Sequence, residues 1–265
     1  MKIADCHMHS FFSSDSEAPT EEMVKRAVEL GLPAICLTDH YDMDYSTGEF
    51  QLDTPAYAAK IRELQEKYRD RIDIRFGVEL GLQLHLKERM EEYVNAWPFD
   101  YVIGSMHVID GKDPYYEDAF PDWTAEELYR AYFRATAENI RFFHNFQTLG
   151  HLDYVVRYCR EREKITATAH LRTRSTFKLR LIQYDIALEI NTGGYKAGLG
   201  VPNPTPDVIR RYRELGGEKI TFGADAHKPE HIAFHFADAA AIAQEAGFRY
   251  YVRFKEKKPE YLPIQ

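Results

Sequence analysis

Short apolar runs alternate along this chain with longer segments whose apolar residues recur at helical spacing. In the segment 20–31, for example, Met23, Val24, Ala27 and Val28 lie on one helical face. The runs predicted to be strands are 1–4, 34–38, 72–78, 101–105, 146–149, 186–190 and 219–222. Strands that alternate with helices in this way are typical of βα units around a parallel sheet, so we expect an α/β fold.

The boundaries between these segments carry cap and loop residues. Thr20 is the expected N-cap of the first helix, and Thr124 forms a capping box with Glu127 at the start of a later one. The connection 108–123 is rich in Tyr, Asp and Phe, so we expect a surface lid rather than a linker. Because neither a linker nor an internal repeat divides the chain, we predict a single domain over residues 1–265.

The composition indicates a protein with a substantial core and no extended nucleic-acid surface. The chain has 265 residues, 45% of them hydrophobic, and a formal net charge of −8 without a block of Lys and Arg. Its apolar runs are too short to span a bilayer, and we find no signal-peptide segment before the polar stretch that begins at Asp5. The cysteines Cys6, Cys36 and Cys159 form no CxxC pair, so we expect free thiols and a cytoplasmic location.

The first candidate chemistry is a pair of histidines, His7 and His9, directly after the first predicted strand. Residues two apart on a strand point to the same side, so both imidazoles can reach one metal ion. In a chain with 11 histidines, such a pair also arises by chance on a surface or in a core. The pair alone therefore leaves both a metal site and a structural role open.

Further residues of metal-binding type lie at the ends of most of the predicted strands. The full set of candidates is His7, His9, Asp15, His40, Glu79, His107, His151, Asp225 and His227. The C-terminal ends of parallel strands converge on one face of a barrel, where such enzymes build their sites. Helix capping or hydrogen-bond networks explain one or two of these positions, but not the whole set. Because the set exceeds the needs of one tetrahedral zinc ion, we predict two or three divalent ions, with Glu79 as a bridge.

Over nearly its whole length, the chain resembles the polymerase and histidinol phosphatase (PHP) phosphoesterases. The motifs that carry the resemblance are His7-Met8-His9, Thr38-Asp39-His40, Glu79, Gly104-Ser105-Met106-His107, Gly150-His151 and Asp225-Ala226-His227. The segments 103–107, 189–193 and 202–206 make it most similar to the barrel-type histidinol-phosphate phosphatases. The resemblance implies a distorted, TIM-like (β/α)7 barrel that holds three metal ions.

The resemblance also implies how the ligands are shared. One ion would take His7, His9, Glu79 and Asp225, a second Glu79, His107 and His151, and a third Asp15, His40 and His227. Position 15 varies in the family and is His in some members, so Asp15 can alter the affinity or identity of the third ion. Mixed imidazole and carboxylate ligands suit Zn, Fe or Mn.

The implied reaction is hydrolysis of a phosphate monoester by a metal-activated hydroxide. By the resemblance, the substrate is L-histidinol phosphate, which is cleaved to L-histidinol and phosphate in histidine biosynthesis. Among the candidate ligands, we assign catalytic roles to Glu79, Asp225 and His227.

Three basic residues are candidates for binding the substrate phosphate, namely Arg157, Arg160 and Lys196. In the phosphatases that the chain resembles, basic residues of these two regions bind phosphate, and many members have Arg at the position of Lys196. A solvated helix face accounts for Arg157 and Arg160 equally well. The loop that contains Lys196 is rich in glycine.

Other functions remain open at the level of sequence. A PHP phosphoesterase that acts on nucleotides or other phosphate esters would have the same ligands, and amidohydrolase-type metal hydrolases also begin with His-x-His. A metal-binding module without enzymatic activity is a third alternative. The expected partner is a small phosphorylated substrate, with no nucleic acid and no membrane, and the protein is expected to be a monomer or a small homo-oligomer.

Overall fold

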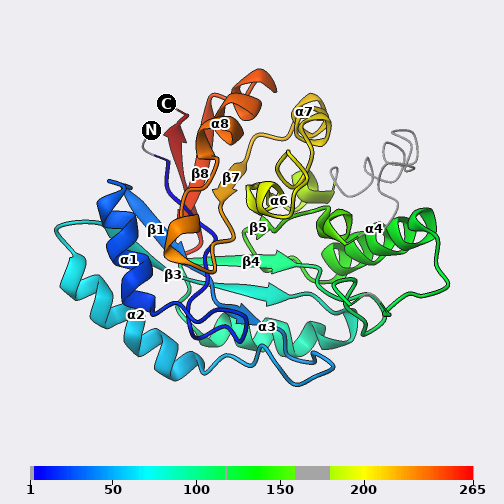
Figure 1. Ribbon diagram of the computed structural model, residues 1–265, viewed down its shortest axis with the longest axis horizontal. Helices are drawn as coiled ribbons and strands as arrows, with labels where there is room; N and C mark the ends of the chain where they lie inside the picture. The colour runs from blue at the N-terminus through cyan, green and yellow to red at the C-terminus, as the bar shows by residue number, and fades with distance from the viewer. Residues whose placement is uncertain (1–2, 117, 159–179, 265) are drawn as a thin grey trace.

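Parallel strands form the centre of the molecule and helices surround them (Figure 1). The structure is a computed structural model that describes residues 3–116, 118–158 and 180–264. Its parallel strands are β1 (Ala34–Leu37), β2 (His40–Tyr41), β3 (Asp73–Gly81), β4 (Tyr101–Ser105), β5 (Thr148–Leu149), β6 (Ala187–Asn191) and β7 (Ile220–Gly223). They pair in the order β1-β3-β4-β5-β6-β7, and β2 continues the line of β1 beside β3. The predicted α/β class is confirmed.

The N-terminal segment closes this sheet into a barrel. Asp5 forms a parallel bridge with Ile35 of β1, and Met8 forms another with Ala226, which follows β7. The two outer strands of the sheet are thereby joined through one segment. This arrangement gives the TIM-like (β/α)7 barrel that the sequence resemblance implies.

The first barrel strand differs from its sequence prediction. The described part of the run 1–4 forms no strand, and the barrel position is taken by the residues that follow, as isolated bridges. The backbone N–H of His7 donates to the Asp5 carboxylate (3.3 Å), and that of Met8 donates to the Thr38 hydroxyl (3.1 Å). Side-chain oxygens therefore accept hydrogen bonds from backbone N–H groups that would pair with a neighbouring strand in a regular sheet.

The helices cover the barrel with one apolar side. They are α1 (Thr20–Glu29), α2 (Thr54–Tyr68), α3 (Lys87–Ala96), α4 (Ala125–Phe142), α6 (Gly193–Lys196), α7 (Pro206–Glu214) and α8 (Phe236–Glu245). Met23 and Val24 of α1 are completely buried on the side of the helix that faces the sheet. The same holds for Ile61 and Leu64 of α2. Removing such side chains from water supplies most of the energy that holds the layers together.

Two of the helix predictions are wrong in detail. Thr20 is the first residue of α1 and not its N-cap, because its hydroxyl donates to the Ser10 hydroxyl (3.1 Å) and Pro19 occupies the cap position. The predicted glycine-rich loop around Lys196 forms the short helix α6. By contrast, the capping box of α4 is confirmed, since Thr124 and Glu127 each accept the other's backbone N–H.

A C-terminal hairpin covers the N-terminal end of the barrel. It consists of the antiparallel strands β8 (Tyr250–Lys255) and β9 (Lys258–Pro263). Tyr251 accepts the backbone N–H of Ala4 through its hydroxyl (3.1 Å), and Phe254 stacks on Tyr101 at the start of β4. Because the hairpin lies at this end, the opposite end of the barrel is the one that can open to a substrate.

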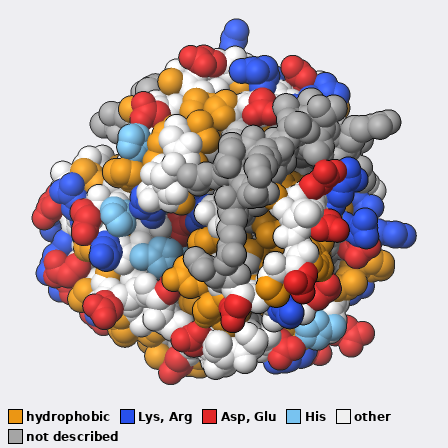
Figure 2. All heavy atoms as spheres, turned by 45° about the vertical axis from the view of Figure 1, so that its right-hand side comes forward, with side chains coloured by type: hydrophobic (Ala, Val, Ile, Leu, Met, Phe, Trp, Pro, Cys, Tyr) orange, Lys and Arg blue, Asp and Glu red, His pale blue; other side chains and the backbone are white. Residues whose placement is uncertain are grey.

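The molecular surface is mixed in charge. Figure 2 shows acidic and basic side chains interspersed over one face, without a broad basic area. Among residues 3–116, 118–158 and 180–264, no helix is both long enough and apolar enough to span a membrane.

Candidate metal centre and substrate pocket

The predicted ligands converge on one cavity at the C-terminal ends of the strands. The cavity has a volume of about 420 Å³. Its wall includes Asp15, His40, His107, His151, Asp225 and His227. The other three candidates, His7, His9 and Glu79, are completely buried beside these residues.

Four of the candidates surround one point in space. Nε2 of His7 lies 3.2 Å from Oε2 of Glu79 and 3.8 Å from Oδ1 of Asp225. Nε2 of His9 lies 3.5 Å and 3.4 Å from the same two oxygens. Separations of this size leave room for one ion at roughly 2.0–2.2 Å from each atom. These are the four residues of the first expected ligand set.

The second oxygen of Glu79 faces another pair of imidazoles. Oε1 of Glu79 lies 2.8 Å from Nε2 of His151 and 3.4 Å from Nε2 of His107. The hydroxyl of Ser105 donates to the same oxygen at 2.6 Å. A carboxylate whose two oxygens face different groups of imidazoles has the geometry of a bridging ligand.

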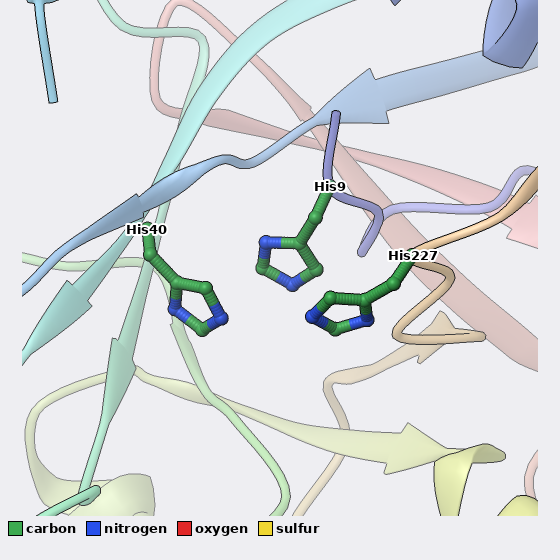
Figure 3. A group of neighbouring side chains, drawn as sticks. All are labelled: His9, His40 and His227. Carbon is green, nitrogen blue, oxygen red and sulfur yellow. The ribbon is translucent and has the colours of Figure 1, made fainter. Parts of the chain in front are cut away.

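The third expected set is also brought together. Oδ2 of Asp15 lies 2.9 Å from Nε2 of His227 and 3.6 Å from Nε2 of His40. Figure 3 shows the rings of His9, His40 and His227 close together, each from a different segment. The His9 ring stacks on both of the others, with centroids 4.1 Å from His40 and 4.2 Å from His227. His9 therefore lies between the first and third groups.

The donor atoms fit divalent metal ions. Among the described residues, Nε2 of His7, Nε2 of His9 and Oε2 of Glu79 are buried without a hydrogen-bond partner. Burial opposes ionisation of Glu79, yet His7, His40 and His107 hold the pKa of its carboxyl well below the usual range. Buried polar atoms that converge without partners are costly unless a ligand satisfies them. A mixed set of imidazole nitrogens and carboxylate oxygens is what zinc, iron and manganese bind.

A buried carboxylate that the sequence reasoning missed, Glu189 of β6, supports this centre from behind. His7 donates from Nδ1 to Oε1 of Glu189 at 2.6 Å, and the backbone N–H of His151 donates to its Oε2 at 2.7 Å. Burial opposes protonation of His7, but Glu189, Glu79 and Asp225 raise its pKa well above the ordinary value. The signal in the sequence was a lone carboxylate within the apolar run of a buried strand.

Asp42, also missed, plays the same part for His107. His107 donates from Nδ1 to Oδ1 of Asp42 at 2.9 Å, which leaves its Nε2 free to face Glu79. The position is tightly packed, because a Cβ on Gly81 would fall on the Asp42 carboxylate. Partners of this kind fix the tautomer and orientation of metal-binding histidines.

Of the predicted basic residues, Arg157 reaches the centre directly. Its side chain is mostly buried and donates to Asp225, Asn191 and Asn203, each at 2.9 Å. It also contributes to the cavity wall. Lys196 is half-buried and donates to the backbone carbonyl of Asp225 at 2.5 Å. Arg160 lies outside the described residues.

Aromatic and acidic side chains form the remaining wall of the cavity. They are Tyr45, Glu49, Phe50, Asp113, Tyr115, Tyr116, Tyr154 and Tyr158. Most of them come from two loops, 42–53 and 108–123, so the segment predicted to be a lid contributes part of the cavity wall. The cavity thus combines a metal-binding side with an aromatic, acidic side.

Comparison with known proteins identifies relatives of the whole chain. Residues 5–193 match the PHP domain family. The chain is 34% identical over 267 residues to the histidinol-phosphatase of Lactococcus lactis subsp. lactis strain IL1403, covering 97% of this chain and 96% of the relative. It is 31% identical over 252 residues to a probable histidinol-phosphatase of Thermotoga maritima, covering 94% of each chain.

Two solved structures also align with most of this chain. The crystal structure of histidinol phosphate phosphatase from Lactococcus lactis subsp. lactis Il1403, in complex with zinc, L-histidinol and phosphate, aligns with a TM-score of 0.90 and 31% identity. The alignment covers 98% of this chain and 99% of that one. A putative histidinol phosphatase from Listeria monocytogenes, 17% identical and covering 89% of this chain and 99% of that one, shares the fold with a TM-score of 0.79.

Proposed function

The chain belongs to the PHP domain family, and we propose that it is a metal-dependent phosphomonoesterase that hydrolyses L-histidinol phosphate to L-histidinol and phosphate. The observation that carries this function is the position of Glu79. Its two carboxylate oxygens face separate groups of imidazoles next to a cavity large enough for a small substrate. Relatives that match over nearly their full length have histidinol-phosphatase names, which supports L-histidinol phosphate as the substrate.

The nine candidate ligands would hold two or three divalent ions of zinc, iron or manganese. We assign them in three sets, namely His7, His9, Glu79 and Asp225, then Glu79, His107 and His151, and finally Asp15, His40 and His227. When bound, such ions polarise the phosphoryl group and lower the pKa of the attacking water. In this proposal Glu79, Asp225 and His227 are catalytic because they would hold the ions that act on the phosphoryl group.

Contacts within the protein keep Asp225 ionised and hold His227 in place. Burial would raise the pKa of the Asp225 carboxyl, but Arg157 and His7 hold it well below the usual range, so Asp225 stays ionised. His227 is oriented by the contact between its Nδ1 and the backbone carbonyl of Asp225 (2.9 Å). Because these contacts exist within the protein, the site needs little rearrangement before it binds a substrate.

Arg157 is the proposed phosphate-binding residue with the strongest structural support. Its guanidinium carries five N–H donors, of which the three contacts to Asp225, Asn191 and Asn203 use only part. Since the side chain also faces the cavity, its remaining donors can meet a phosphoryl oxygen. Lys196 and Arg160 remain proposed contacts from the neighbouring segments.

The function is tested by phosphate release from L-histidinol phosphate against a panel of monoesters that includes nucleoside monophosphates. We expect the kcat/KM for histidinol phosphate to exceed that for every other member. Equal rates on all of them would leave a phosphatase but remove the biosynthetic assignment. A strong preference for nucleotides would favour a different member of the same family.

Two further predictions concern the cellular location and the oligomeric state of the protein, not its reaction. A cytoplasmic location and a monomeric or small homo-oligomeric state stay predictions from the sequence.

A further inference from the structure

One carboxylate of the cavity wall, Asp113, is held rigidly by groups from three segments. Its Oδ2 accepts the Tyr45 hydroxyl at 2.7 Å, and its Oδ1 accepts the backbone N–H of Tyr115 at 2.8 Å and the Tyr154 hydroxyl at 3.4 Å. Asp113 itself is only 8% exposed. Its position is therefore fixed before any substrate enters.

The partners of Asp113 neutralise none of its charge. Among the described residues, no Lys, Arg or His lies within 4.0 Å of its carboxylate, whereas Asp225 has Arg157 and Asp42 has His107. Burial raises the pKa of the Asp113 carboxyl, although the hydrogen bonds from Tyr115 and Tyr45 and the more distant charge of His107 act in the opposite direction. A buried carboxylate without a cation is unfavourable, so this wall of the cavity is suited to a cationic ligand group.

The location of Asp113 matches one part of the substrate. The Tyr154 ring that touches Asp113 lies 5.6 Å from the His107 ring and 5.1 Å from the His151 ring, both at the metal centre. In histidinol phosphate, the ammonium group is separated from the ester oxygen by only two carbon atoms. A cation that close to the phosphate must lie next to the metal-binding side of the cavity, where Asp113 stands.

We propose that Asp113 is a specificity-determining residue, which binds the ammonium group of a phosphorylated amino alcohol through its carboxylate. This inference rests on the proposed function and adds to it how the leaving alcohol is recognised. The aromatic side chains around it, Tyr115, Tyr116 and Tyr158, then surround the rest of the alcohol. A neutral alcohol of the same length leaves the Asp113 charge unpaired and is a poorer substrate.

The test compares histidinol phosphate with 3-(imidazol-4-yl)propyl phosphate, which lacks only the amine. In the Asp113→Asn variant, kcat/KM for histidinol phosphate should fall about 10- to 100-fold, the value of a charged hydrogen bond. The kcat/KM for the desamino ester should change little. Equal losses on both esters would overturn the inference, because they would indicate a purely structural role.

The matched control is Asp110→Asn, in the same loop. Asp110 is exposed, does not line the cavity and has a positive φ of 50°, which Asn tolerates. This variant should hydrolyse both esters as the wild type does. If it too loses activity on histidinol phosphate alone, the charge of Asp113 is not the cause and the inference fails.

The wild-type protein gives a second test that does not depend on how the variant folds. We expect it to prefer histidinol phosphate over the desamino ester by about tenfold or more. Equal kcat/KM values for these two esters, with both preferred over other monoesters, would overturn the role of Asp113 and leave the proposed function intact. Failure to prefer either over other monoesters would overturn the proposed function itself.

Discussion

Nδ1 of His7 lies 2.6 Å from Oε1 of Glu189, with both side chains completely buried. The contact joins the N-terminal segment to β6 and leaves Nε2 of His7 directed at Glu79 and Asp225. A histidine whose second nitrogen donates to a carboxylate is held in one tautomer and is a stronger ligand. Glu189 therefore supports the proposed metal centre through His7, without being one of the proposed ligands itself.

Replacing Glu189 with Gln should weaken metal binding. The amide keeps the shape of the side chain but removes the charge that His7 faces, so we expect metal affinity to fall about 10- to 100-fold. The measurement is competition with a chromophoric chelator. Glu88→Gln, on the exposed side of α3, is the matched control and should retain wild-type affinity. Unchanged affinity in Glu189→Gln would show that the His7 contact has no bearing on the metal.

Glu79→Gln should remove most of the activity and part of the metal. The two oxygens of Glu79 face separate groups of imidazoles, so its loss affects two proposed ion positions at once. Several kcal/mol of transition-state stabilisation depend on those positions, which corresponds to a loss of more than about 100-fold in kcat. Kinetics and elemental analysis should be done on the same preparation. Near-normal turnover with normal metal content would rule out the bridging role.

Arg157 and Lys196 should respond differently to replacement by Ala. Arg157→Ala removes the guanidinium that pairs with the buried Asp225, so we expect a loss of about 3–5 kcal/mol in the free energy of unfolding, together with lower metal content. Lys196→Ala removes a contact to a backbone carbonyl, and should mainly raise KM with little effect on stability. Urea unfolding and steady-state kinetics check both. An Arg157→Ala protein as stable as Lys196→Ala would contradict this division.

Metal binding should release protons and weaken as the pH falls. Burial lowers the pKa of His107, but Asp42 and Glu79 outweigh it and raise that pKa to about 10 in the metal-free protein. The imidazole is then protonated at neutral pH and must lose its proton to bind an ion, so affinity falls by up to about tenfold per pH unit for each proton released. Calorimetry in buffers of different ionisation enthalpy measures this release. Binding without proton release at pH 7 would contradict the assigned protonation of His107.

Much of the fold and of the metal set could be predicted because both depend on local sequence. Apolar runs between helical segments predicted the strands, and the residue types at strand ends predicted which side chains converge beside the cavity. The N-terminal segment was predicted less well, since the acceptors that interrupt its ladder, Asp5 and Thr38, act on its backbone through side chains and not through the pattern of apolar residues.

The supporting residues could not be predicted in the same way. Glu189, Asp42 and Asp113 act through partners that are distant in sequence, so no spacing rule connects them. Their roles depend on contacts that form only when the barrel brings β6 beside His7 and the 42–53 and 108–123 loops to one cavity.

The central claim is that the nine ligands hold a metal cluster that hydrolyses histidinol phosphate. The most direct measurement is to titrate metal-free protein with zinc or manganese while following bound metal and phosphate release from histidinol phosphate together. We predict no activity without metal, and a rise that is complete only when two or three ions are bound per chain. Full activity in the metal-free protein, or full activity with a single ion per chain, would contradict the account.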